Sequence, residues 1–209
     1  MILALVPCLL GLFVASEYLS YMSTPQSLAP PFSDAWTYQA AGERLNAGHE
    51  LYQLGPGDRP VLEVPGLHAP LLSPPPIAVV WRPIAALPFG LAAWVVACWM
   101  AVLGTTFFLV LRTGIRGAIV ACLLAPAIGE QLAACNVAAF FPVLMVLAWK
   151  ARERELGGVA VGVMAAVKLT PASLVGWLVG SRLWRAVVGF VIAVIAILIV
   201  TVLGAGLGS

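Results

Sequence analysis

The sequence predicts an all-α integral membrane protein, a polytopic bundle of apolar helices with one polar loop near its N-terminus. Three observations lead to this prediction. Hydrophobic residues make up 62% of the 209 residues and charged residues only 10%, whereas an ordinary soluble domain has roughly 25% charged residues. The mean hydropathy is +1.02. The apolar residues also form runs that approach the length of about 20 residues that a helix needs to cross a bilayer.

The composition argues against a metal site, a disulfide framework and a nucleic-acid partner. The sequence has no basic patch with interleaved aromatic residues of the kind that nucleic-acid-binding proteins carry, so nucleic-acid binding has no support. His49 and His68 have no second ligand at metal-binding spacing. The four cysteines lie in or beside apolar runs without a C-x-x-C motif, and we interpret them as small buried hydrophobic residues: Cys8, Cys98, Cys122 and Cys135.

The N-terminal part of the chain predicts one span and then a surface helix. We expect the first span from about Ile2 to Ser20, uncleaved because it lacks the basic start of a signal peptide. Ser33 can then cap a short helix that stops at Gly48, with Asp34 in the first turn, where the positive end of the helix dipole favours a carboxylate. Its apolar residues share one face, which predicts a helix lying on the membrane surface: Tyr38, Ala41 and Leu45.

The later apolar segments differ in length, and only some can cross a bilayer. Ile77–Leu87 is too short to span, and Arg82 within it must face protein, water or a lipid headgroup because a cation is costly in lipid. Gly90–Leu111, which carries two tryptophans (Trp94 and Trp99), is a clean span. A last span runs from Ala186 to about Leu203. Shorter apolar halves flank two polar interruptions, at 129–136 and 168–171: Gly117–Ile128 with Val137–Trp149, and Gly157–Val167 with Ala172–Gly180.

These segments predict a single membrane domain over residues 1–209, with about five to seven apolar helices and a loop over 21–76. Residues 33–76 contain five acidic residues and two arginines, which gives this segment a net charge of −3. The three later connectors are basic, so the positive-inside rule puts them in the cytoplasm and the acidic loop outside. We interpret these basic residues as topology determinants: Arg112, Arg116, Lys150, Arg152, Arg154, Arg182 and Arg185.

The predicted topology places five polar residues on the extracytoplasmic side, and these are the main candidates for a site: Asp34, Glu130, Gln131, Asn136 and Lys168. An ionisable residue inside a span costs about 2.5–3.5 kcal/mol on insertion scales, so it usually has a partner or a role. Asp34 could act as a general base or be only a helix N-terminal acid. Lys168 could neutralise a phosphate or pair with Glu130 or Asp34.

The other polar candidates also have two interpretations. Glu130 is the second-best acid, whereas Gln131 and Asn136 could bind sugar hydroxyls or be ordinary turn residues. Tyr38, like Trp36 and Tyr52, could stack on a sugar, although aromatic residues at a membrane interface need no such role. We favour the interface role for all three.

The order of six short motifs is more specific than any one of them. From the N-terminus they are Ser33-Asp34, Gly48-His49-Glu50-Leu51-Tyr52, Pro74-Pro75, Arg82-Pro83-Ile84-Ala85-Ala86-Leu87-Pro88, Gly129-Glu130-Gln131 with Asn136, and Ala166-Val167-Lys168-Leu169-Thr170-Pro171 followed by Arg182-Leu183-Trp184-Arg185. In this order they resemble glycosyltransferase family 87, the polyprenyl-phosphate-sugar-dependent transferases. The chain departs from the family pattern at its Gly-Gln-x-Asn turn, which is spread by extra residues, and at 73–76, which lacks the expected aromatic residue or Asn.

The resemblance implies a GT-C type enzyme of the bacterial cytoplasmic membrane, active on the extracytoplasmic face. Such enzymes move mannose or arabinose from a polyprenyl-phosphate donor to a lipid or cell-envelope glycan acceptor, with no nucleotide sugar and no cofactor. The family's first-loop aspartate corresponds to Asp34, the implied general base. From its charge, Lys168 is the candidate for the donor phosphate, and Arg82 and Tyr38 complete the candidate binding residues. Family members are longer, so we expect an N-terminal portion of such an enzyme.

Two further functional classes remain open from the sequence. A transporter or flippase half would also place polar residues at broken helices, although no inverted repeat is evident. A non-catalytic membrane subunit is the third possibility, and it would be indifferent to replacement of Asp34.

Overall fold

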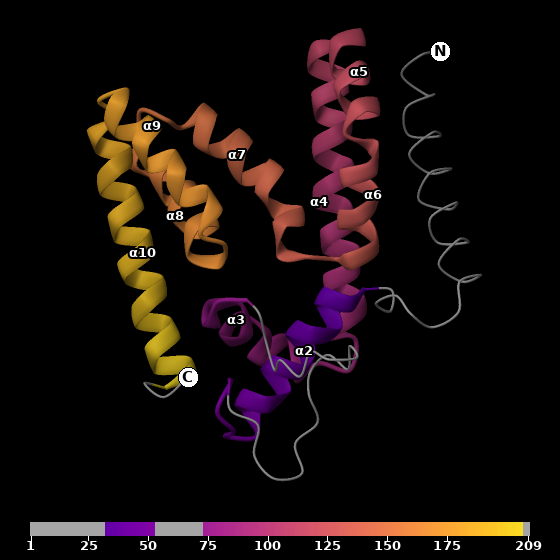
Figure 1. The fold of residues 1–209 in the computed structure, drawn as a ribbon, viewed down its shortest axis with the longest axis vertical. Coiled ribbons are helices and arrows are strands. Elements are labelled where there is room, and N and C mark those ends of the chain that lie inside the picture. The colour runs from indigo at the N-terminus through magenta and orange to yellow at the C-terminus, as the bar shows by residue number, and fades with distance from the viewer. Residues whose placement is uncertain (1–31, 53–72, 207–209) are drawn as a thin grey trace, which may run out of the picture. The chain divides into compact units, whose positions relative to one another are not determined.

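The computed structural model describes residues 32–52 and 73–206, and every regular element in this part of the chain is a helix (Figure 1). The predicted all-α membrane fold is therefore confirmed. The helices α4 (Gly90–Thr113) and α10 (Trp184–Ala205) are long and apolar enough to cross a bilayer. A third crossing results if the bent pair α5–α6 counts as one span. The span expected from Ile2 to Ser20 and most of the first loop lie outside the described residues.

The chain divides into two compact units, each formed by two stretches of sequence. The first unit comprises Met1–Ala35 and Ala92–Pro142, and the second comprises Trp36–Leu91 and Val143–Ser209.

In the first unit, α5 (Ile115–Leu123) and α6 (Ala125–Ala134) follow α4 (Figure 1). The chain reverses at Gly114, whose φ of 60° suits a residue without a Cβ atom. Small residues of α5 then pack on Val110 of α4: Ala118 and Ala121. The axes of α5 and α6 differ by 62°, because Pro126 has no backbone N–H with which to continue the ladder of α5.

The end of α6 differs from the sequence-based prediction. We expected the polar stretch 129–136 to interrupt the helix, but Glu130 and Gln131 lie inside α6. Both are good helix formers despite their polarity, so the helix continues to Ala134. The break comes at Cys135, which adopts a left-handed conformation with φ 50°. A 3-10 helix, η1 (Val137–Phe140), and then α7 (Phe141–Lys150) follow.

The second unit is centred on α8 (Glu155–Val167), which packs along α10 (Figure 1). Glycines permit this close approach: a Cβ atom on Gly158 would lie 1.6 Å from the carbonyl oxygen of Ala186. Small residues at such contacts let membrane helices approach closely. The expected break after α8 is present, since Lys168 is extended and is followed by η2 (Thr170–Ser173) and α9 (Leu174–Gly180).

The second unit also holds most of α2 (Ser33–Asn46) and all of α3 (Pro75–Ala85). The apolar face predicted for α2 is present, because Tyr38, Ala41 and Leu45 are all buried. The location of α2 on the membrane surface stays a prediction. Its apolar face is covered by α3, with the Tyr38 and Trp81 ring centroids 6.4 Å apart. A Cβ atom on Gly42 would lie 2.8 Å from the backbone of Trp81, so the two helices touch directly.

Candidate functional site

Asp34 lies in the first turn of α2 and is half-buried in the first unit. Its carboxylate oxygen Oδ2 accepts a hydrogen bond from the side-chain amide of Asn136. Two residues earlier, the backbone N–H of Phe32 donates to the carbonyl oxygen of Ala133 at 2.7 Å. The start of α2 is therefore attached to the end of α6 at two points, one of which is the candidate base itself.

Asn136 is fixed because both ends of its side-chain amide are used. It is the N-cap of η1, and its Oδ1 accepts from the backbone N–H of Ala138 at 2.8 Å. The amide nitrogen is then turned away from η1 and donates to Asp34. The two sequence candidates Asp34 and Asn136 are thus brought into direct contact, and Asn136 has a structural role as well.

Two tryptophans of α4 hold the turn that carries Asn136. The last carbonyl groups of a helix have no partner within it, and here indole N–H groups supply donors. Trp99 donates to the carbonyl oxygen of Leu132 at 3.0 Å, and Trp94 donates to that of Cys135 at 2.9 Å. Trp94 also packs edge-on against Phe140, with ring centroids 5.2 Å apart.

Sequence reasoning missed this role of the tryptophans, because it treated them as ordinary residues of a span. The available signal was chemical: a buried indole N–H usually has a hydrogen-bond acceptor. A thiol completes the cluster, since Cys98 is buried and its Sγ lies 3.7 Å from the carbonyl oxygen of Cys135.

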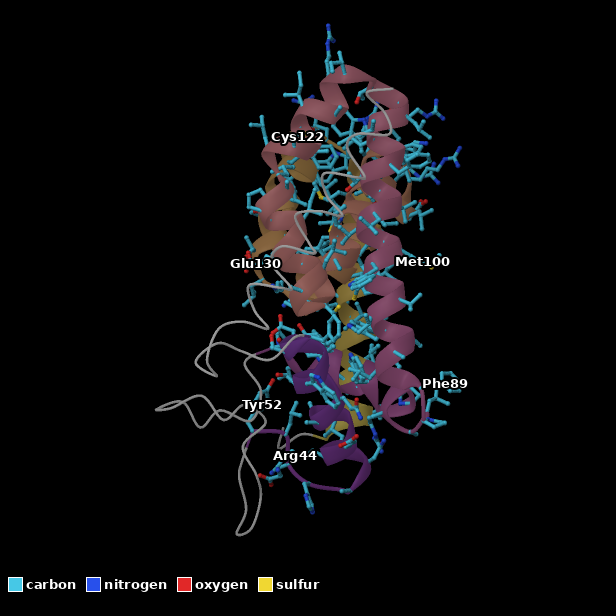
Figure 2. All side chains as sticks on the ribbon, turned by 90° about the vertical axis from the view of Figure 1, so that its right-hand side faces the viewer. Arg44, Tyr52, Phe89, Met100, Cys122 and Glu130 are labelled. Atoms are coloured by element: carbon cyan, nitrogen blue, oxygen red, sulfur yellow. The ribbon has the colours of Figure 1, made fainter. Side chains whose placement is uncertain are left out.

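Glu130 and Gln131 follow each other on α6 but differ in their surroundings. Glu130 is exposed, on the outer surface of its helix (Figure 2). The Oε1 atom of Gln131 is buried, and the described residues provide no donor for it. A buried acceptor without a donor is costly in a folded protein. Gln131 is therefore the better of the two for binding a hydroxyl group.

The side chains of Arg82 and Tyr38, two candidates of the second unit, make contacts within the protein. The Arg82 guanidinium donates through Nε to Oδ1 of Asn46 at 3.0 Å and through Nη1 to the carbonyl oxygen of Gly204 at 2.7 Å. Asn46 in return donates to the Arg82 carbonyl oxygen at 2.8 Å. Arg82 therefore faces protein, one of its three expected environments. Tyr38 is only 1% exposed and cannot stack on a sugar in this conformation.

Lys168, the remaining candidate, lies in the second unit at the break between α8 and η2. Its backbone N–H still donates to Met164, while φ −139° and ψ 130° turn the chain out of the helix. The side chain is half-buried. A cation at an unwound helix end is suited to an anionic group.

Tyr52 lies at one edge of the first-loop segment that is not described. Its hydroxyl donates to the carbonyl oxygen of Ser73 at 2.8 Å, which joins the two ends of that segment. Burial raises the pKa of Tyr52 above its usual value. Among the described residues, no group of three or more His, Cys, Asp or Glu side chains could hold a metal ion.

Comparison with known proteins identifies one family. The model of glycosyltransferase family 87 matches residues 72–209. This segment includes the Asn136 turn and Lys168, whereas Asp34 precedes it. No curated protein and no solved structure matches the chain.

Proposed function

Since the chain belongs to glycosyltransferase family 87, we propose that it transfers mannose or arabinose from a polyprenyl-phosphate donor, with Asp34 as general base. Family membership and the apolar helices make it a membrane glycosyltransferase. We further propose a lipid or cell-envelope glycan as acceptor and the extracytoplasmic face as the side of transfer. The acidic first loop and the basic later connectors support this orientation.

The hydrogen bond between Asn136 and Asp34 carries the assignment of the base. A general base must be held in one orientation and still have a free lone pair for the incoming proton. Asn136 occupies Oδ2, and no described residue donates to Oδ1. The turn that presents Asn136 is itself held by Trp94 and Trp99. Such fixed positioning supports catalysis, because small misplacements of reacting groups are costly.

The proposed reaction is a displacement at the anomeric carbon of the sugar. The acceptor hydroxyl oxygen bonds to this carbon, and its proton passes to Asp34. The bond between the carbon and the donor phosphate breaks, and the polyprenyl phosphate leaves with the electron pair. Lys168 is proposed, on its charge, to stabilise the negative phosphate. Gln131 is proposed to accept a hydrogen bond from a hydroxyl group, which would satisfy its buried Oε1.

The test is sugar transfer in membranes that contain the full chain, with a panel of polyprenyl-phosphate sugars. Asp34→Asn removes the base while keeping the size of the side chain, and Asp34→Ala removes the whole group. We expect both to lower transfer by a factor of 10² or more, the usual contribution of a general base being roughly 10²–10⁴. Glu43→Gln is the matched control, since it makes the same chemical change at an exposed position of the same helix.

Two results would contradict the proposal. Transfer that survives Asp34→Asn would exclude Asp34 as the base while leaving the donor class supported. Absence of transfer from every polyprenyl-phosphate sugar, with the wild-type chain folded in the membrane, would contradict the donor class.

A further inference from the structure

Two basic connectors of the second unit begin at neighbouring helix ends. One lies between α7 and α8, and the other between α9 and α10. Together with the adjoining helix ends they carry five of the 11 Lys and Arg residues of the chain but only two acidic residues, Glu153 and Glu155. We define these five cations as the basic patch: Lys150, Arg152, Arg154, Arg182 and Arg185.

A stacked pair of indoles links the end of α7 to α9. Trp149 at the end of α7 and Trp177 of α9 have ring centroids 5.9 Å apart and planes inclined by 14°. The Arg152 guanidinium lies 5.1 Å from the centre of the Trp149 ring, a cation–π arrangement. Trp149 is nevertheless 61% exposed, so the face of this pair is available to a partner.

An ion pair joins the first turns of α8 and α10. Arg185 donates to both carboxylate oxygens of Glu155, through Nε at 2.8 Å and Nη2 at 3.3 Å. The backbones also meet here, because a Cβ atom on Gly189 would lie 2.0 Å from the carbonyl oxygen of Glu155. The first turns of α8 and α10 are therefore side by side, and Glu155 and Arg185 neutralise each other's charge.

Three other cations of the patch, Arg152, Arg154 and Arg182, are poorly neutralised by carboxylates. Arg152 lies 3.7 Å from Glu153, whose side chain is 77% exposed, a pair that contributes little in water. In the described part of the chain, Arg154 and Arg182 have no carboxylate partner, and both are exposed. The patch therefore keeps positive charge beside the exposed indole of Trp149 and at the ends of apolar helices.

We propose that the basic patch binds the phosphate of an anionic phospholipid, with Trp149 and Trp177 at the boundary between headgroups and acyl chains. Indoles favour this boundary, and the guanidinium group matches a phosphate in shape and charge. The apolar surface continues from the patch along α10, where exposed residues include Val188, Ile192 and Ile195. A lipid satisfies both parts of this surface. This proposal is independent of the proposed sugar transfer.

The test compares retention of phosphatidylglycerol and phosphatidylcholine by the purified full chain, measured by native mass spectrometry. We expect preferential retention of phosphatidylglycerol. The double variant Arg154→Gln/Arg182→Gln should weaken it by roughly fivefold per removed charge, the contribution of a basic residue near an anionic membrane surface. The control Arg112→Gln/Arg116→Gln removes two arginines of the first unit and should leave the preference unchanged.

Three outcomes would overturn the proposal. They are equal retention of the two lipids by the wild-type chain, an unchanged preference in the Arg154/Arg182 variant, and an equal loss in the control variant. Inorganic phosphate added at the concentration of the lipid distinguishes the two sources of a phosphate group. It should not displace phosphatidylglycerol, and displacement would mean that the patch binds free phosphate instead.

Discussion

Trp94 donates its indole N–H to the carbonyl oxygen of Cys135, and the next residue in the chain, Asn136, donates to Asp34. A tryptophan near the start of the apolar helix α4 thus fixes the turn at Cys135, and the next residue orients the Asp34 carboxylate. All of these residues belong to the first unit. The arrangement makes separate predictions for the positioning of Asp34 and for the stability of the turn.

Asn136→Ser should separate the two roles of Asn136. Serine is also a good N-cap, so the melting temperature in detergent should stay close to that of the wild type. The serine hydroxyl is too short to replace the amide nitrogen at Asp34, and sugar transfer should fall about 10²-fold, as expected for a misplaced catalytic group. Asn136→Ala should lower transfer equally and also cost about 1 kcal/mol of stability through loss of the cap. Wild-type transfer by Asn136→Ser would contradict the positioning role.

Trp94→Phe should destabilise the protein while keeping an aromatic ring beside Phe140. The substitution leaves the buried carbonyl of Cys135 without its indole donor, which costs about 1–3 kcal/mol. The Cys98 thiol, 3.7 Å away, remains as a weak partner, so we expect the lower end of this range. Thermal unfolding in detergent measures the difference. Trp184→Phe, at a 60% exposed position, is the control and should change stability by less than about 0.5 kcal/mol.

Gly158→Ala should force α8 and α10 apart, because its Cβ atom would lie 1.6 Å from the Ala186 carbonyl oxygen. Backbone cannot yield as a flexible side chain can, and we expect a loss of about 1–3 kcal/mol or more. Gly176→Ala is the matched control, because a Cβ atom there meets nothing within 4 Å. It should be neutral or slightly stabilising, since alanine favours the helix. Equal melting temperatures for the two variants would contradict the close packing of α8 on α10.

The ion pair of Glu155 with Arg185 should make stability depend on pH in the acidic range. Hydrogen bonding to Arg185 lowers the pKa of Glu155 below its ordinary value of 4.5. A lowered folded-state pKa means that the stabilisation is present above the unfolded-state pKa and is lost as the pH falls through the folded-state pKa. Wild type should therefore be more stable than Glu155→Gln at neutral pH and lose this advantage in acid. An advantage that stays constant down to pH values below both pKa values would exclude the pair as its source.

The long apolar segments could be predicted from the sequence, and the partners of their polar residues could not. The span predicted from Gly90 to Leu111 is α4, and the span predicted from Ala186 to Leu203 is α10, because continuous apolar runs leave few alternatives. For Arg82 the sequence left three environments open. The Gly204 carbonyl oxygen that it binds is 122 residues further along the chain, and no local pattern indicates such a contact.

In the candidate site too, the residues could be selected from the sequence but their contacts could not. Asp34 and Asn136 could be selected from the sequence because polar residues are rare in this chain, but their contact spans 102 residues. Glu130 and Gln131 were assigned to a break because they are polar, whereas their helix propensity keeps them in α6. The hydrogen bonds donated by Trp94 and Trp99 could not be predicted from the sequence. Their acceptors are backbone carbonyl groups, which every residue has, so no residue type marks them.

The bend between α5 and α6 has a consequence for how the protein enters the membrane during synthesis. The two helices have nine and ten residues, about half of what a single crossing requires, and they pass the length and hydropathy test only as a pair. If the pair forms one crossing, the insertion machinery must accept both helices in one step. A charge introduced at the exposed residue Ile119 should keep α6 as well as α5 out of the membrane. The Asn136 turn would then not reach its position relative to the bilayer. Glycosylation-tag mapping of the chain behind α6 would detect this failure of biogenesis, even where every residue of the site itself is unchanged.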